Sequence, residues 1–244
     1  MNGSWRLIID EPLDAAANMA RDEALLHGVQ RGEAVTLRFY AWRPWAFSLG
    51  YFQNWADFEA HAKRGMPIVR RLTGGGAIWH ADEVTYSLVG PFGRDGFPGR
   101  AADIFEKVHA TIAEGLASLG VNAELSDAPT GRSATICFEK PQKFDIVVGG
   151  RKLLGSAQRR YGGWFLQHGS LPLSPNEYAP AAISISDILV NPPAAGRIIE
   201  ALAGAFERAF EVKCVPASLT AEEAAEAAEL AKSKYASEKW NQRR

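Results

Sequence analysis

Three stretches rich in β-forming residues follow one another between residues 143 and 171, and pairs of glycines separate them. The stretches are 143–148, 152–160 and 164–171. Gly149-Gly150 is a two-residue turn of the kind that closes a β-hairpin, because both positions can adopt positive φ. Gly162-Gly163 marks the next turn. Strands joined by turns this short run antiparallel, so this segment restricts the chain to folds that contain an antiparallel sheet.

The remaining chain alternates between strand and helix candidates. Five further stretches have strand character: 5–9, 35–40, 47–52, 68–72 and 84–89. Helical patterns cover 14–30, 103–119 and 194–210, and a capping box at Thr220 starts a last helix. Because helices and hairpin strands are interspersed, we expect an α+β fold with a mixed, largely antiparallel sheet flanked by helices. We predict one domain over residues 1–244, and the sequence leaves open whether its C-terminal helix, 220–244, is an appendage.

Composition and charge exclude several classes of protein. The 27 basic and 28 acidic residues nearly cancel, so no global charge favours nucleic acid or a membrane surface. No apolar run approaches the roughly 20 residues that span a bilayer, and residues 1–6 lack the pattern of a secretory signal. Cys137 and Cys214 form neither a zinc motif nor a disulfide framework. We therefore expect a cytoplasmic protein with reduced thiols and no metal site.

A glycine-rich motif is the first candidate binding site. Its members are Arg70, Arg71, Thr73, Gly74, Gly75, Gly76 and His80. Three glycines let the backbone approach a ligand closely, with several N–H groups directed into one cavity, and the paired arginines suit a carboxylate, a phosphate or a thioester oxygen. The motif is neither a phosphate-binding Walker loop, which needs Gly-Lys-Ser/Thr, nor a dinucleotide fingerprint, which needs a following helix. The alternative is a tight turn with solvated arginines.

Lys152 and Cys137 are the candidates for the chemistry itself. Lys152 lies on a strand that continues into Gly155, Ser156 and Ala157. Its charge can polarise an acyl carbonyl or hold an acyl phosphate. The Cys137 thiol can accept an acyl group from a thioester with little change in bond energy. The alternatives are a surface lysine on a hairpin and a buried, unreactive cysteine.

Other residues carry weaker indications. His168, at a strand end, is either a site residue or a packed histidine, and Glu83 either braces the glycine loop or is a surface carboxylate. Cys214 has no motif around it, so we predict a structural role. A group of cationic residues can attract an acidic partner, or it can be a solvated basic face. This group comprises Lys140, Lys143, Arg151, Lys152, Arg159 and Arg160.

Taken in order, these segments resemble the lipoate/biotin protein ligase superfamily over roughly residues 5–175. The resemblance is carried by 18–26, 38–42, 48–53, 70–75, His80, 83–87, 137–138, Lys152 with 155–158, and 167–170. Within the superfamily, the segments are most similar to the cysteine-dependent octanoyltransferases, which use octanoyl-acyl carrier protein as donor. The resemblance implies the lipoate/biotin ligase catalytic fold, with an acyl tunnel beside the glycine loop.

The resemblance also implies a reaction. Cys137 would take octanoyl from the thioester of acyl carrier protein, and Lys152 would hold the acyl carbonyl. A lysine of a lipoyl domain, or of a glycine cleavage H-type protein, would then attack the Cys137 thioester. The glycine motif, together with Gly155, Ser156, Ala157 and His168, would bind substrate. Because a thioester is already activated, transfer would need neither ATP nor a metal.

One departure keeps a second activity open. Gly76 stands where the cysteine-dependent transferases often carry arginine and where lipoate ligases carry glycine. The main alternative is therefore an ATP-dependent lipoate-protein ligase, which would use ATP and Mg²⁺. Only about 70 residues follow Ser170, too few for the extra C-terminal domain of many ligases. Transfer between two lipoyl domains and a non-catalytic acyl-binding module are further alternatives.

Overall fold

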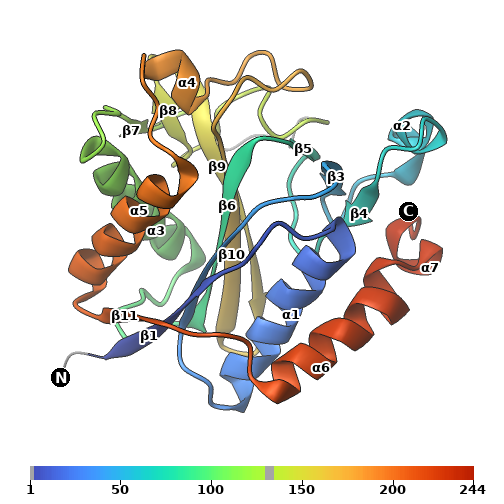
Figure 1. Ribbon diagram of the computed structural model, residues 1–244, viewed down its shortest axis with the longest axis horizontal. Coiled ribbons are helices and arrows are strands. Elements are labelled where there is room, and N and C mark those ends of the chain that lie inside the picture. Colours follow the sequence, from blue (N-terminus) through green and yellow to red (C-terminus); the bar gives the residue numbers. More distant parts are fainter. Residues whose placement is uncertain (1–2, 130–134) are drawn as a thin grey trace.

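A mixed eight-stranded sheet forms the centre of the computed structural model, which describes residues 3–129 and 135–244 (Figure 1). Its strands lie in the order β11-β1-β2-β6-β10-β9-β8-β7. In chain order they are β1 (Ser4–Ile9), β2 (Thr36–Tyr40), β6 (Glu83–Pro91), β7 (Glu124–Leu125), β8 (Ile146–Val148), β9 (Arg151–Tyr161), β10 (Trp164–Pro172) and β11 (Lys213–Pro216). β1 runs parallel to β2 and β11, and every other pair in this order is antiparallel. The predicted mixed, largely antiparallel sheet is confirmed.

A smaller sheet carries the start of the glycine motif. It has the order β4-β3-β5, with β3 (Ala46–Leu49), β4 (Ile68–Arg70) and β5 (Ile78–His80). β3 pairs in parallel with β4 and antiparallel with β5. The glycine loop connects β4 to β5, so both of its ends are anchored on β3.

Both predicted glycine turns are confirmed as the connections of hairpins. Gly149 and Gly150 have φ of 56° and 75°, and Gly162 and Gly163 have φ of 54° and 86°. Positive φ at both positions gives the turn a twist that matches the flanking strands. The strand predicted over 143–148 begins later, at Ile146, because Phe144 adopts a left-handed backbone with φ of 69°.

Helices cover both faces of the large sheet (Figure 1). They are α1 (Ala15–Arg31), η1 (Trp55–Asp57), α2 (Glu59–Lys63), α3 (Ala101–Ala117), α4 (Ile185–Ile188), α5 (Ala195–Phe210), α6 (Ala221–Leu230), the π-helical segment η2 (Ala231–Tyr235) and α7 (Glu238–Asn241). α3 and α5 pack together on one face, while α1 and α6 lie on the other. None of the described helices has the length and apolarity needed to cross a membrane.

Strand alternation divides the buried residues between the two faces. Leu37 and Phe39 of β2 belong to the cluster that includes Ile112 of α3 and Phe206 of α5. Between them, Arg38 points the other way and is fully buried, donating to Asp22 of α1 at 2.7 Å. Both faces of β2 are therefore covered, one by apolar packing and one by an ion-paired network.

The C-terminal segment is packed onto the rest of the molecule. α6 lies along α1, and Glu223 accepts from Arg6 of β1 at 2.6 Å. The capping box at Thr220 is present, because the Thr220 and Glu223 side chains each accept from the other's backbone N–H. Further along, Lys234 donates to Glu23 of α1 at 2.7 Å. These contacts hold α6 along α1, and α7 lies against β4 of the smaller sheet.

Candidate active site

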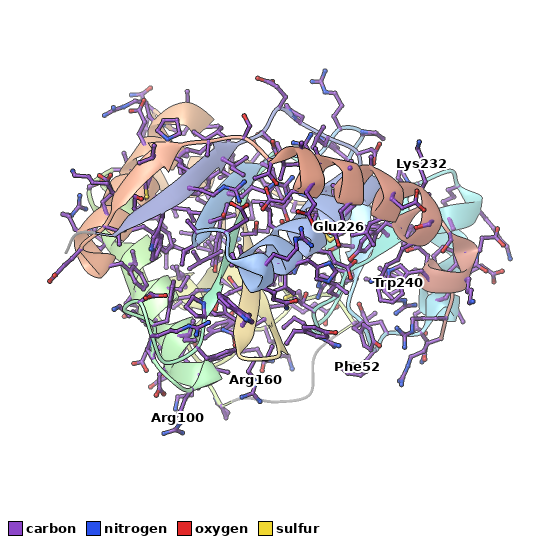
Figure 2. All side chains as sticks on the ribbon, turned by 90° about the horizontal axis from the view of Figure 1, so that it is seen from below. Phe52, Arg100, Arg160, Glu226, Lys232 and Trp240 are labelled. Atoms are coloured by element: carbon purple, nitrogen blue, oxygen red, sulfur yellow. The ribbon has the colours of Figure 1, made fainter. Side chains whose placement is uncertain are left out.

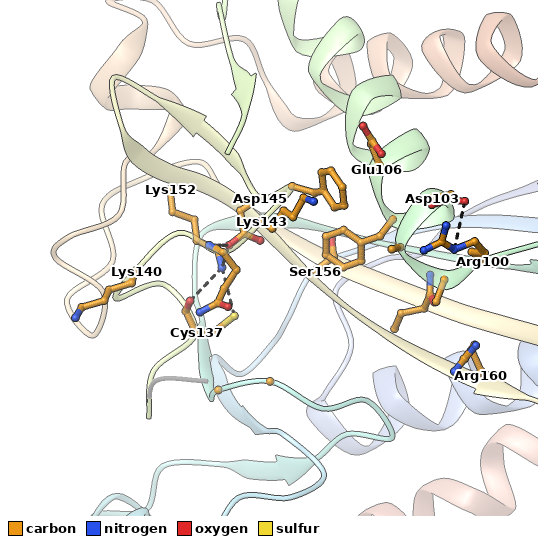
Figure 3. A pocket seen from close by; sticks show the side chains of 18 residues that line it. Arg100, Asp103, Glu106, Cys137, Lys140, Lys143, Asp145, Lys152, Ser156 and Arg160 are labelled. Atoms are coloured by element: carbon orange, nitrogen blue, oxygen red, sulfur yellow. Dashed lines mark hydrogen bonds and ion pairs between the residues drawn. The ribbon is translucent and has the colours of Figure 1, made fainter. Parts of the chain in front are cut away.

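Cys137 and Lys152 point toward each other at one end of the large sheet (Figure 3). The Lys152 Nζ lies 3.7 Å from the Cys137 Sγ and donates to the Cys137 carbonyl oxygen at 3.1 Å. The loop that carries Cys137 is held to the glycine loop, since the Cys137 N–H donates to the Ala77 carbonyl at 2.8 Å. The structure therefore brings together the two residues that the sequence proposed for the chemistry.

Asp145 is the charged partner of Lys152. Its Oδ2 lies 2.7 Å from Nζ, and both side chains are almost completely buried. Burial lowers the pKa of Lys152, but the Cys137 and Asp145 charges outweigh it and raise that pKa overall. Burial raises the pKa of Asp145, and Lys152 opposes this rise. At neutral pH, Lys152 is thus a cation fixed beside the thiol.

A bulge in β9 makes room for the Lys152 side chain. Ile146 pairs with Leu154, but the next residue, Val147, pairs with Lys152, so β9 contains one extra residue. Residues three apart in a regular strand point to opposite faces, and the extra residue puts Lys152 and Gly155 on the same face. A Cβ on Gly155 would lie 2.3 Å from Lys152 Cε. The absence of a side chain at Gly155 therefore leaves the space through which the Lys152 side chain reaches Cys137.

Two pockets meet at Cys137. The larger is a cavity of about 800 Å³, and its walls include Gly75, Gly76, Asp145, Lys152 and Gln158. Four cationic side chains also line it: Arg100, Lys140, Lys143 and Arg160. The smaller pocket is lined by Met19, Tyr40, Trp42, Ile78 and Ala157, together with Ser48, Arg71 and His80. Cys137 and Ser156 line both pockets.

The predicted cationic group is only partly gathered at this site. Lys140, Lys143, Lys152 and Arg160 line the larger cavity. Arg151 instead donates to the carbonyl oxygen of Ala182, away from the cavity. Arg159 lies outside the cavity lining, with its guanidinium 5.2 Å from the centre of the Tyr51 ring.

Arg71 holds the glycine loop in place. Its guanidinium is buried and donates to the carbonyl oxygens of Ser48, Gly74 and Gly76 at 2.9, 2.6 and 2.7 Å. Burial lowers the pKa of Arg71 to about 10, so the side chain stays charged at neutral pH. Because Arg71 draws the Gly74 carbonyl toward itself, the N–H of Gly75 in the same planar peptide points the opposite way.

One hydrogen-bonded relay leads from Arg71 to α1. Arg71 can only donate, so Thr73 Oγ1 accepts from it at 3.1 Å and directs its own hydrogen to His168 Nε2 at 2.7 Å. His168 then carries its proton on Nδ1 and donates to Asp22 at 2.9 Å. Burial lowers the pKa of His168, which keeps the ring neutral. Thr73 and His168, both singled out from the sequence, thus contact each other directly, and His168 is held in turn by Asp22, which was not predicted.

A second relay runs from Arg71 in the other direction. The Arg71 guanidinium donates to Ser48 Oγ at 3.2 Å, and this oxygen lies 2.7 Å from His80 Nε2. His80 Nδ1 lies 2.8 Å from Glu83 Oε1, and Ser170 donates to Glu83 Oε2 at 2.7 Å. Glu83 therefore supports the loop through His80, which is the bracing role proposed for it.

Arg70 lies apart from the pockets. Its Nε and Nη2 donate to the Asn241 carbonyl of α7 at 3.0 and 2.8 Å, and Nη1 donates to the Gln53 carbonyl at 2.7 Å. Arg70 and Arg71 are consecutive in an extended segment, so their side chains point to opposite sides. That alternation could have shown, from the sequence, that only one of them faces the site.

Asp145 and His109 are the principal site residues that the sequence did not indicate. His109 of α3 is fully buried, with Nδ1 2.7 Å from the Phe144 carbonyl and Nε2 2.7 Å from Ser156 Oγ. Burial lowers the pKa of His109 to about 3. The signal for Asp145 was a lone carboxylate in an apolar run beside a hairpin, but the bulge that aligns it with Lys152 has no sequence signature here.

This geometry coincides with a family match. The model of the lipoyl protein ligase A/B catalytic domain covers residues 14–204. The chain belongs to this family. The match includes the glycine loop, Cys137, Lys152 and His168, and it confirms the resemblance inferred from the motif order.

Relatives in the family align with this chain over nearly its whole length. Octanoyltransferase LipM of Kyrpidia tusciae is 38% identical, and the alignment covers 99% of each chain. Octanoyltransferase LipM of Moorella thermoacetica is 37% identical, covering 99% of this chain and 98% of its own. Similarity therefore extends beyond the family match to the C-terminal helices.

Solved structures of lipoate ligases share the fold. Lipoate-protein ligase A bound with ATP has a TM-score of 0.83 and 25% identity, with 99% of both chains covered. Protein Ta0514 of T. acidophilum, with bound lipoic acid, has a TM-score of 0.85 and 25% identity, covering 99% of this chain and all of that one. The lipoate-ligase-like fold is confirmed.

Proposed function

We propose that this chain is an octanoyltransferase of protein lipoylation that moves an octanoyl group through a Cys137 thioester to a lysine of a lipoyl domain. The observation that carries the proposal is the Cys137 Sγ, 3.7 Å from the Lys152 ammonium where the two pockets meet. The full-length relatives named octanoyltransferase LipM support the same reaction.

The donor of the proposed reaction is octanoyl-acyl carrier protein. The larger cavity has room for its thioester arm, and the cationic side chains of that cavity suit the arm's phosphate. The smaller pocket has apolar walls that include Met19, Trp42 and Ile78 and that suit an acyl chain. Its volume is only about 20 Å³, so these side chains must move apart before the chain enters. A thioester placed across both pockets would have its carbonyl carbon at Cys137.

Loading begins when the Cys137 sulfur attacks that carbonyl carbon. A bond forms between sulfur and the acyl carbon, the acyl carbon's bond to the carrier sulfur breaks, and the departing thiolate takes up the proton that Cys137 gave away. Lys152 stabilises the thiolate before attack. Once Sγ is acylated and neutral, the Lys152 N–H that faced it can donate to the developing oxyanion.

The glycine loop can supply a further donor. Gly75 lines the larger cavity, and its N–H points away from Arg71. In the described part of the chain this N–H has no hydrogen-bond partner. A backbone N–H held rigidly by a buried arginine suits oxyanion stabilisation, because it needs no reorganisation during the reaction.

Unloading reverses the role of Cys137. The ε-amine of the acceptor lysine attacks the acyl carbon, a C–N bond forms, and Cys137 leaves as a thiolate beside Lys152 while the surplus amine proton passes to solvent. The acceptor in this proposal is a lipoyl domain or a glycine cleavage H-type protein. Neither half-reaction uses ATP or a metal, since the thioester is already activated.

Intact mass spectrometry tests the proposal. The protein mixed with octanoyl-acyl carrier protein, without ATP, is expected to gain one octanoyl mass, lose it to an apo lipoyl domain, and gain nothing as Cys137→Ala. If no adduct forms, but the acceptor is labelled once free lipoate, ATP and Mg²⁺ are supplied, the chain is a ligase. That outcome would agree with Gly76 and with the ATP-bound structural neighbour.

A further inference from the structure

Arginine side chains gather on half-buried and exposed aromatic rings next to the glycine loop. Arg243 lies 4.1 Å from the centre of the Tyr51 ring, Arg159 lies 5.2 Å from the same ring, and Arg244 lies 5.4 Å from the Phe52 ring. Phe52 is 61% exposed. Together with Trp240, which Arg243 also contacts, we call these residues the arginine–aromatic surface.

The guanidinium groups of this surface have no carboxylate partner among the residues that the structure describes. Some exposed arginines elsewhere are paired, since Arg197 contacts Glu200 at 2.6 Å and Arg208 contacts Glu114 at 3.0 Å. Arg43, Arg64 and Arg94 are exposed without a carboxylate partner among the described residues, but they are not gathered on aromatic rings beside the site. Their charges also act on one another, since Arg243 and Arg244 contribute to a lowered pKa of Arg70, behind the burial of that side chain. Clustered like charges repel, and an anionic partner would relieve this repulsion.

The surface is a rigid continuation of the cavity rim. Phe52 Cδ2 lies 3.9 Å from the position that a Cβ on Gly74 would take, and the backbone N–H of Trp55 donates to the Arg244 carbonyl at 2.7 Å. Arg160, next to Arg159 on β9, lines the larger cavity. Figure 2 shows Arg160, Phe52 and Trp240 along one side of the molecule.

A basic groove extends the surface away from the rim. It has a volume of about 320 Å³, and its walls include Lys234, Lys239, Trp240 and Arg243. Arginine, tyrosine and tryptophan together are the composition typical of protein-binding hot spots, and cations in such a setting select carboxylates. The occupant that fits is therefore a folded protein that carries acidic side chains.

The reach of the two proposed substrates decides which protein this is. The donor presents its thioester on a long arm, so its body can stand away from Cys137. The acceptor has only a lysine side chain to extend, so its body must contact the rim of the cavity that contains Cys137. We propose that the arginine–aromatic surface docks the acceptor lipoyl domain through carboxylates around its target lysine. This inference rests on the proposed function.

The test separates the two half-reactions. Wild type and R159E/R243E/R244E are first loaded from octanoyl-acyl carrier protein, and discharge to an apo lipoyl domain below saturation is then followed by mass spectrometry. Loading is expected to be unchanged, and discharge is expected to slow by about tenfold at low salt. Added salt should slow the wild type and leave the variant nearly constant.

Controls keep the outcomes distinct. Discharge to hydroxylamine, which needs no docking, should be the same in both proteins, and R243Q/R244Q should show a smaller loss in the same direction. R197E/R208E reverses two exposed charges of α5, which lies on the opposite face of the large sheet from α6, and should discharge like wild type (Figure 1).

Two results would overturn the inference. Unchanged discharge from the triple variant would remove the surface from acceptor binding, and slowed loading with normal discharge would assign it to the carrier protein instead. A wild-type protein that forms no octanoyl adduct would contradict the proposed function, which is a separate outcome.

Discussion

The site has two walls: the glycine loop with Arg71, and the Cys137 loop with Lys152. Each wall contains a buried cation, but the two cations have different hydrogen-bond partners. Arg71 donates to three carbonyl oxygens and two hydroxyls, all belonging to the protein. Lys152 has one strong partner, Asp145, at 2.7 Å, and its nearest other groups are the carbonyl and the thiol of Cys137. Lys152 also lines the larger cavity, whereas Arg71 lines the smaller pocket with its donors already bonded to the protein.

This difference gives the two cations different roles: Arg71 supports the loop, and Lys152 takes part in the reaction. A guanidinium whose donors are all occupied fixes the backbone around it and has nothing left for a substrate. An ammonium that faces a thiol retains a donor that becomes available as soon as the thiol is acylated. Substitutions on the Arg71 wall should therefore affect stability first, and substitutions on the Cys137 wall should affect turnover first.

Replacing Cys137 should have the largest effect on turnover. Cys137→Ala is expected to lower octanoyl transfer by more than about 10³-fold, because it removes the sulfur that holds the acyl group in the proposed reaction. The variant should unfold at nearly the wild-type temperature, since Cys137 is a partly exposed loop residue. Full transfer by the purified variant would rule out the thioester route.

Lys152→Ala should lower transfer by roughly 10²- to 10³-fold through loss of the charge beside sulfur and oxyanion. The pH dependence of the transfer rate in Asp145→Asn tests the same Lys152 charge. Asp145 helps to raise the pKa of Lys152, so its removal lowers that pKa, and the alkaline fall in transfer rate should begin at a lower pH. An unshifted pH–rate profile in Asp145→Asn would show that Lys152 does not control the alkaline limb.

On the opposite wall, Arg71→Met should lower the free energy of unfolding by about 3 kcal/mol, because carbonyl groups of Ser48, Gly74 and Gly76 lose a buried donor. Urea unfolding measures this. Arg160→Gln, an exposed cavity cation, is the matched control and should change stability little. Equal stability of the two variants would remove the distinction between the walls.

His109 predicts a pH dependence of stability. Its folded pKa of about 3 lies below the unfolded value near 6.5, so the unfolded chain binds more protons below that value. Stability is complete above about pH 6.5 and falls by up to about 1.4 kcal/mol per pH unit as the pH decreases toward 3. Urea unfolding of His109→Gln between pH 6.5 and 4.5 should show a shallower decline in stability. Part of the decline should remain, because burial also lowers the pKa of His168.

The smallest effect is expected at the second cysteine. Burial, with a contribution from Glu207, raises the pKa of Cys214 to about 11, so its thiol is protonated at neutral pH. Cys214→Ser should leave transfer unchanged and stability within about 0.5 kcal/mol. Iodoacetamide at pH 8 should modify Cys137 well before Cys214, as peptide mapping would show.

The sequence predicted much of the fold because its signals are local. Glycine pairs specified the hairpins around β9, and Asp14 caps α1 by accepting from the Ala17 N–H at 2.8 Å, as expected. The start of the strand predicted over 143–148 could not be placed, because the left-handed backbone of Phe144 precedes β8 and depends on its surroundings. Its carbonyl is held by His109 of α3, which is distant in the chain.

The site was predictable as a set of residues and not as an arrangement. Motif order selected Cys137 and Lys152, but their 3.7 Å contact depends on a bulge and on Asp145. The pattern also grouped Arg70 with Arg71, although Arg70 anchors α7. Relays through Asp22 and Ser48 join segments far apart in sequence, and no local pattern reports such contacts.

Gly155 contributes to the reaction because it has no side chain. Its missing methyl group leaves the space that the Lys152 chain crosses, because a Cβ there would meet Cε at 2.3 Å and Nζ at 2.5 Å. A chain with alanine at this position could retain every functional group of the site and still lose its alignment. When related genomes are searched for active enzymes, a lysine followed three positions later by glycine is therefore a stricter criterion than the lysine alone.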